Sequence, residues 1–198
     1  MMVQFEKLKE LLKQLPGIGE KTAERMIFYI ISKGKRYSTD LAEEIKNINN
    51  TIKICSNCGG YGEADPCEIC SDLRRDKGIL MVLERPRDIF IFEKSKRYRG
   101  KYHVLGGLIS PIDGVTPENL NIENLMKRIK NEYISEVILS LPPTTEGATT
   151  TIYLSRLLCN KVESVSTIAR GVPFGSDFEF IDEYTLQRSL DKRQKWTE

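Results

Sequence analysis

Apolar residues in the first part of the chain recur at the spacing of helices. They predict a first helix over residues 5–15, a second between Gly19 and Gly34, and a third that leads to residue 52. The run Pro16-Gly17-Ile18-Gly19 separates the first two helices, because proline and glycine interrupt regular structure. The apolar positions are Phe5, Leu8, Leu11, Leu12, Leu15, then Ala23, Met26, Ile27, Ile30, Ile31, then Leu41, Ile45, Ile48 and Ile52.

The pattern changes to alternating strands and helices after residue 78. Strands are expected at 79–83, 102–106, 136–141 and 164–169, and helices at 86–94, 118–132 and 147–158. Such alternation predicts an α/β fold with a parallel sheet. Functional loops of parallel sheets lie at the carboxyl ends of the strands, which is where Glu84 and the loop 142–147 fall.

Four cysteines between these two regions are spaced as Cys55-x₂-Cys58-x₈-Cys67-x₂-Cys70. Two such pairs predict one zinc ion per chain in a tetrahedral shell of four thiolates, which has no open position and is therefore structural. A disulfide pair and a redox C-x-x-C motif are the alternatives. The fifth cysteine, Cys159, falls in an apolar helical pattern and is expected to be buried.

The segment that joins the first two helices resembles a helix-hairpin-helix DNA-binding motif, with the pattern L-P-G-I-G-x-K-x-x-x-R. Gly17 and Gly19 would let backbone N–H groups and a helix N-terminus approach a phosphate. Lys21 and Arg25 are four residues apart, so they share a helical face and can reach neighbouring phosphates. Such contacts do not read bases, so binding should be independent of sequence. An ordinary pair of helices joined by a Pro-Gly turn is the alternative.

Composition is that of an ordinary globular protein, with 198 residues, 40% hydrophobic and 29% charged, and a net charge of +2. Basic residues are unevenly spread: residues 71–101 hold ten Lys and Arg against five acids, and residues 1–54 hold ten against seven. These clusters suit either a polyanion or a solvated face. The charged N-terminus lacks a signal-peptide pattern, and no apolar stretch is long enough to span a membrane. We therefore expect a cytoplasmic protein.

The order of these segments resembles the bacterial RecR family over essentially the whole chain. The strand that ends in Glu84, and the later strand followed by P-T-T-E-G-A-T, resemble a Toprim domain, the fold of topoisomerases, primases and certain nucleases. The expected domains are a helix-hairpin-helix region at 1–54, a four-cysteine zinc finger at 55–70, a Toprim domain at 78–173 and a tail at 174–198. In that tail, residues 178–182 resemble a Walker B strand, although no G-x₄-G-K-[ST] motif accompanies it.

The resemblance implies a DNA-binding recombination mediator in DNA repair. Proteins of this family assemble as ring-shaped tetramers and act with RecO and RecF to help load RecA at single-stranded gaps, and they have no established catalytic reaction. On that basis this chain would be a homotetramer with structural zinc. Glu84 and Glu146, at the ends of two strands, would form an acidic patch that repels DNA and docks a basic partner such as RecO or RecF.

The sequence departs from catalytic Toprim enzymes at one place. Those enzymes carry an Asp-x-Asp pair just before the equivalent of Glu146, and here the two positions are Pro142 and Thr144. A magnesium-dependent reaction on phosphate needs converging carboxylates, and only Glu84, Glu146 and the more distant Asp113 remain. A Mg²⁺-dependent Toprim nuclease or topoisomerase-like enzyme is the alternative function. Pro142 also departs from the Asn-Pro-Thr that is usual in the RecR family.

Overall fold

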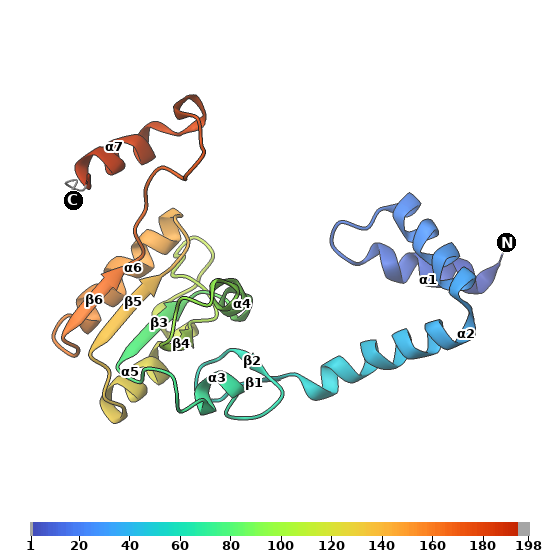
Figure 1. Ribbon diagram of the computed structural model, residues 1–198, viewed down its shortest axis with the longest axis horizontal. Helices are drawn as coiled ribbons and strands as arrows, with labels where there is room; N and C mark the ends of the chain where they lie inside the picture. Colours follow the sequence, from blue (N-terminus) through green and yellow to red (C-terminus); the bar gives the residue numbers. More distant parts are fainter. Residues whose placement is uncertain (1, 194–198) are drawn as a thin grey trace. The chain divides into compact units, whose positions relative to one another are not determined.

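The computed structural model describes residues 2–193, which form two compact units that divide between Lys53 and Ile54. Figure 1 shows the helical unit in blue to cyan and the mixed α/β unit in teal to red. None of the helices in the described part of the chain is long and apolar enough to cross a membrane.

The first unit is a helical hairpin of α1 (Val3–Lys13) and α2 (Glu20–Thr51). The path of α2 breaks at Gly34, which has φ 80° and ψ 177°, and this break corresponds to the predicted boundary between the second and third helices. Ala23 and Ile27 are buried on α2, and the rings of Phe5 and Phe28 lie 5.3 Å apart, so the two helices pack through a small apolar seam. Packing of α1 against α2 thereby fixes both ends of the loop 14–19 that joins them.

The second unit is built on a four-stranded parallel sheet, as the sequence predicts. Its strands are β3 (Ile79–Leu83), β4 (Lys101–Val104), β5 (Glu136–Ser140) and β6 (Ser164–Thr167), in the order β4-β3-β5-β6. Figure 1 shows them side by side. Alternation along β3 places Leu80 and Val82 in one apolar cluster and Met81 and Leu83 in another, so both faces of the sheet are covered.

Helices cover the two faces. α5 (Ile122–Asn131) and α6 (Thr145–Leu158) contribute Leu125, Leu154 and Leu158 to the larger cluster, whereas α4 (Pro86–Ser95) contributes Ile89 to the smaller one. The single helix expected over 118–132 is instead a 3₁₀ turn, η1 (Pro117–Asn119), followed by α5. The backbone is extended at Leu120, whose side chain is buried in the larger cluster, and this interrupts the helix.

Two expectations for the C-terminal part are wrong. The strand expected at 178–182 is a 3₁₀ turn, η2 (Phe178–Phe180), followed by α7 (Glu183–Asp191). Asp182 does not end a strand, because its carboxylate accepts a hydrogen bond from the Thr185 N–H at 2.8 Å and caps α7. Cys159 is exposed and not buried, since it follows the last turn of α6. The end of the tail, residues 194–198, lies outside the described residues.

Candidate metal centre and nucleic-acid interface

The four cysteines of the predicted zinc site converge in the structure. Their Sγ atoms all lie within 4.8 Å of one another, and Cys55, Cys58 and Cys67 are buried. The Cys58–Cys67 and Cys55–Cys70 sulfur separations are 3.7 and 3.9 Å. A Zn–S bond of about 2.3 Å places tetrahedral sulfurs about 3.8 Å apart, so the observed spacing fits one zinc ion and is too long for disulfides, whose S–S bond is about 2.05 Å.

Tight local structure brings the ligands together. Cys55 and Cys58 flank the turn between β1 (Lys53–Ile54) and β2 (Tyr61–Gly62), and Cys67 and Cys70 lie at the short helix α3 (Glu68–Ser71). Gly59 has φ +72°, and a Cβ on Gly60 would lie 2.6 Å from Cδ1 of Ile89. Glycine suits the left-handed backbone conformation at position 59, and a residue without a side chain at position 60 leaves room for the Ile89 side chain of α4.

Charge crowding in the cysteine cluster also fits a cation. Hydrogen bonds, first from the Cys70 thiol and also from the Gly60 N–H, lower the pKa of Cys58 to about 5. Burial raises the pKa of Cys67 to about 11, and the hydrogen bond to Cys58 raises that of Cys70 as well. Four thiolates at this spacing repel one another, and a divalent ion removes that repulsion. Among residues 2–193, these cysteines are the one group of metal-type ligands that converges.

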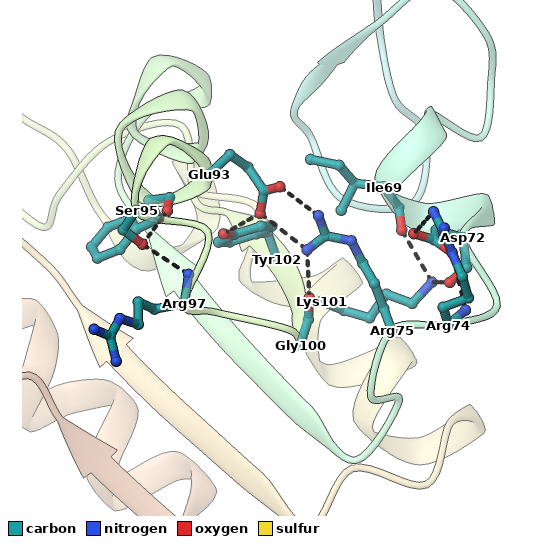
Figure 2. A network of polar contacts seen from close by, with 11 residues as sticks. Ile69, Asp72, Arg74, Arg75, Glu93, Ser95, Arg97, Gly100, Lys101 and Tyr102 are labelled. Carbon is teal, nitrogen blue, oxygen red and sulfur yellow. Dashed lines mark hydrogen bonds and ion pairs between the residues drawn. The ribbon is translucent and has the colours of Figure 1, made fainter.

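The cysteine module packs directly onto the edge of the sheet. The Val104 N–H of β4 donates to the carbonyl oxygen of Cys58 at 2.7 Å. Lys101, at the start of the same strand, donates from Nζ to the carbonyl oxygen of Ile69 at 3.2 Å (Figure 2). It also donates to the carbonyl oxygen of Cys70. The module therefore covers the edge of β4, which has no strand partner on that side among the described residues.

A second set of polar contacts joins the chain after the cysteines to α4 and β4 (Figure 2). The Arg75 guanidinium donates to both carboxylate oxygens of Glu93 and, at 3.1 Å, to the carbonyl oxygen of Gly100. Tyr102 donates its hydroxyl to the same carboxylate at 2.7 Å. No sequence pattern predicts this network, because its members lie far apart in the chain and carry no motif.

Half of the ten basic residues in segment 71–101 have an intramolecular carboxylate partner or are buried. Arg74, Arg75, Arg85 and Arg87 each approach a carboxylate within 4.0 Å, and Lys101 is buried. Ion-paired guanidinium groups attract a polyanion less than free ones do. The segment is therefore a weaker candidate for a nucleic-acid surface than its number of Lys and Arg residues suggests.

In the helical unit, basic residues take two different roles. Lys9 is 7% exposed, and its ammonium lies 2.9 Å from Glu6, 3.3 Å from Glu20 and 3.6 Å from Glu24, so it links α1 to the first turns of α2. Lys21 and Arg25 are exposed and form no salt bridge within the described residues. Their charges are therefore available to an external partner.

The hairpin places backbone donors beside these two cations. Gly17 has φ +78°, and a Cβ on Gly19 would meet no atom within 4 Å, so the backbone there is open to an approaching group. Gly19 is the N-cap of α2 and supplies no side-chain cap to the first turn. The N–H groups at this helix start lack the acceptor that Ser, Thr, Asp or Asn would provide, and such a helix N-terminus suits an anion.

At the carboxyl edge of the sheet, Glu84 and Glu146 follow the neighbouring parallel strands β3 and β5. Glu146 is exposed in the first turn of α6. Glu84 is 7% exposed, and its carboxylate lies 2.8 Å from Nε of Arg85. The expected acidic patch of two open carboxylates is therefore wrong for Glu84, because burial and the ion pair remove it from the surface. Asp113 accepts from the Ser110 hydroxyl at 2.6 Å in a turn and does not join a metal-ligand group among the described residues.

The loop before α6 has a structural role at the two positions where Toprim enzymes carry aspartates. Thr144 is the N-cap of α6 and accepts from the Gly147 N–H at 3.1 Å. Gly147 is buried, and a Cβ there would collide with the carbonyl oxygen of Pro142. Pro142, Thr144 and Gly147 thus fix the turn into α6, and they place no carboxylate at the strand end.

Comparison with known protein families assigns each segment of the chain. Residues 5–48 match the model of the RecR helix-hairpin-helix, residues 52–72 the RecR zinc finger domain with four cysteine ligands, residues 78–169 the Toprim domain, and residues 171–194 the RecR C-terminal segment. The order agrees with that read from the sequence. The zinc-finger match and the sulfur geometry together identify Cys55, Cys58, Cys67 and Cys70 as the residues that would hold one zinc ion.

Curated relatives match along almost the entire chain. Recombination protein RecR of Tropheryma whipplei (strain Twist) is 44% identical over 183 residues, which are 92% of each chain. Recombination protein RecR of Pelotomaculum thermopropionicum is 43% identical over 96% of this chain and 94% of its own. Recombination protein RecR of Enterococcus faecalis is 42% identical over 96% of both chains. The chain therefore belongs to the RecR family of recombination proteins.

Proposed function

We propose that this protein is a DNA-binding recombination mediator that performs no catalytic step of its own. In this proposal it binds DNA without sequence preference, assembles as a ring-shaped homotetramer, and acts with RecO and RecF to help load RecA at single-stranded gaps. The observation that carries the DNA-binding part is the hairpin of the helical unit, where two cations without a salt bridge in the described structure lie beside an uncapped helix start.

Lys21 and Arg25 support binding to the phosphate backbone. Both lie on the first two turns of α2, and both are exposed. Glycine at the N-cap lets a phosphate approach the N–H groups of α2 while the two side chains neutralise its charge. Because every nucleotide presents the same phosphate, these contacts position DNA without reading its sequence.

The side chains at the carboxyl edge of the sheet support a role without catalysis, because they include too few open carboxylates to bind a catalytic metal ion. Transfer of a phosphoryl group by a Toprim enzyme depends on several carboxylates that converge on a metal ion. Here Glu84 is buried in a pair with Arg85, Thr144 caps a helix, and Glu146 is left as an exposed carboxylate. Incubation with nicked, gapped and supercoiled DNA in the presence of Mg²⁺ or Mn²⁺ separates the two functions, since a nuclease or topoisomerase would change the DNA and a mediator would not.

Exposed apolar residues support self-association. Phe174 and Phe180 in the tail are almost fully accessible, and Leu11, Phe28 and Ile31 are more than half exposed in the helical unit. Apolar side chains in such number are typical of surfaces that become buried between subunits. Mass measurement in solution at several concentrations tests the tetramer.

Glu146 supports a docking role for the carboxyl edge of the sheet. It is exposed and repels DNA phosphate, so a basic protein partner suits it better than nucleic acid. RecO and RecF are the partners that the family resemblance implies. DNA binding by a variant without the Lys21 and Arg25 charges tests the DNA-binding part of the proposal directly.

A further inference from the structure

Lys101 is a buried cation that no carboxylate neutralises within the described residues. It is 6% exposed, and none of the salt bridges of residues 2–193 includes it. Its Nζ donates to the carbonyl oxygens of Ile69 at 3.2 Å and of Asp72 at 3.5 Å (Figure 2). It also donates to the carbonyl oxygen of Cys70. Carbonyl oxygens satisfy its N–H groups but supply no net charge.

An uncompensated buried ammonium is costly, because an ion loses several kcal/mol of hydration when it leaves water. Lys9 of the helical unit shows the usual solution, since three carboxylates lie within 4.0 Å of its Nζ. Asp72 contacts Lys101 only through its carbonyl oxygen. Its carboxylate pairs with Arg74, with Oδ1 2.9 Å from Nε of Arg74. The negative charge that compensates Lys101 therefore has to come from another group.

The cysteine centre is the group that can supply this charge. Zn²⁺ with four thiolates keeps a net negative charge, and three of the four cysteines are buried. Lys101 contacts the carbonyl of Cys70, one of the four, and the carbonyls on either side of that turn. A cation at this position stabilises the loaded centre electrostatically, because Lys101 is buried and the contacted turn at Cys70 is only partly exposed, so that water screens the two charges incompletely.

The position of Lys101 is fixed independently of the cysteines. It is the first residue of β4, opposite Leu80 of β3 in the sheet register, and its carbonyl oxygen accepts from the Tyr98 hydroxyl at 2.8 Å. The Val104 N–H of the same strand donates a hydrogen bond to the carbonyl oxygen of Cys58 at 2.7 Å. The sheet edge thus presents the ammonium to the cysteine loop from a rigid support.

We propose that Lys101 is the counter-charge of the zinc centre and sets how tightly the chain holds zinc. Lys101 is a positioning residue in this account, since it acts on the metal through the charge and backbone of its ligands. Outer partners of this kind typically change metal affinity by about 10–100-fold when they are replaced.

Three replacements separate charge from hydrogen bonding. Lys101→Arg keeps the charge, Lys101→Gln keeps a donor without charge, and Lys101→Met keeps neither. Lys77→Met is the matched control, because Lys77 is an exposed lysine in the segment that follows the cysteines. The full-length variants are titrated with zinc against a chromophoric chelator, and the thermal midpoints of the zinc-loaded and metal-free forms are compared.

The proposal predicts at least about 10-fold weaker zinc binding for both Lys101→Gln and Lys101→Met, and affinity close to the wild type for Lys101→Arg and Lys77→Met. Both neutral variants should lower the midpoint of the zinc-loaded protein more than that of the metal-free protein. Wild-type affinity in Lys101→Gln would show that hydrogen bonding suffices and would overturn the proposal. Equal destabilisation of the two forms, with unchanged affinity, would also overturn it, because Lys101 would then serve the fold alone.

Discussion

The guanidinium of Arg75 lies against the carboxylate of Glu93, with Nη1 3.0 Å from Oε1, and this contact ties the segment after the cysteines to α4. The Arg75 side chain is 13% exposed and that of Glu93 is 31% exposed, so the pair is shielded from most solvent. The hydrogen bonds from Arg75 and Tyr102 outweigh burial and keep the pKa of Glu93 below its ordinary value. The pair therefore stabilises the folded state at neutral pH.

A double-mutant cycle on Arg75→Met and Glu93→Gln should give a coupling energy of about 1–3 kcal/mol in the free energy of unfolding. The control cycle uses Arg74→Met and Asp72→Asn, because Arg74 is 90% exposed in its side chain and an exposed pair contributes less than about 1 kcal/mol. Equal coupling in the two cycles would contradict the role assigned to the shielded pair.

His103 should make stability depend on pH. It is fully buried, its Nε2 lies 2.7 Å from the carbonyl oxygen of Asn121, and Nδ1 has no partner in the described structure. Burial lowers the pKa of His103 to about 4, with a smaller contribution from Arg128. The unfolded chain, with a histidine pKa of about 6.5, then binds the proton more readily than the folded protein does.

The stabilisation linked to neutral His103 is fully present above pH 6.5 and is lost as the pH falls toward 4. It amounts to about 3 kcal/mol, since each pKa unit corresponds to about 1.4 kcal/mol. The free energies of unfolding of the wild type and His103→Gln, measured from pH 7 to pH 4, should therefore converge by roughly this amount. Acid release of zinc affects both proteins and cancels in the difference. A difference that stays constant with pH would refute the assignment.

Removal of one zinc ligand should cost folding stability. We expect one zinc per chain in the wild type and much less in Cys58→Ala, because binding energy at a closed site is folding energy. A loss of about 5 kcal/mol would lower the melting temperature by roughly 10–20 °C in a chain of this size. The chain offers its own control in Cys159→Ala, since Cys159 is exposed and apart from the cluster. Full zinc content in Cys58→Ala would be incompatible with the four-cysteine centre.

Charge reversal at Glu146 tests the docking surface. Glu146→Lys should weaken binding of purified RecO, leave zinc content and assembly unchanged, and leave DNA binding equal or slightly stronger. The substitution also places a positive charge in the first turn of α6, which costs about 0.3–1 kcal/mol of helix stability. Glu118→Lys supplies the control, because Glu118 is exposed in the first turn of η1. Unchanged affinity for RecO together with a sharp loss of DNA binding would reverse the assignment.

The parts that the sequence predicts correctly are those governed by local patterns. The apolar run of β3 and the cysteine spacing each fix a structure from a few adjacent residues, and the break at Gly34 follows from one residue type. The resemblance of residues 178–182 to a Walker B strand gave a wrong prediction of a strand. The Asp182 carboxylate instead caps α7, and the apolar residues Phe178 and Phe180 before it are exposed.

Contacts between segments that are distant in the sequence could not be predicted from local patterns. Lys101 reaches carbonyls about thirty residues earlier, and Arg75 pairs with Glu93 across 18 residues. In the sequence both basic residues count toward a charge cluster that suggests nucleic acid, whereas the fold buries one and pairs the other. The burial of Glu84 likewise depends on the packing around the end of β3, which no residue pattern specifies.

We propose that Lys21 and Arg25 bind the DNA backbone, so the decisive experiment measures how DNA affinity depends on salt concentration. The variant Lys21→Gln/Arg25→Gln is compared with Lys130→Gln/Lys161→Gln, which removes the same charge from exposed positions of the second unit. The account predicts that the first variant binds all sequences more weakly, with a slope of log affinity against log salt reduced by about two. The second variant should retain the wild-type slope. Wild-type affinity and slope in the first variant, with its fold intact by circular dichroism, would contradict the account.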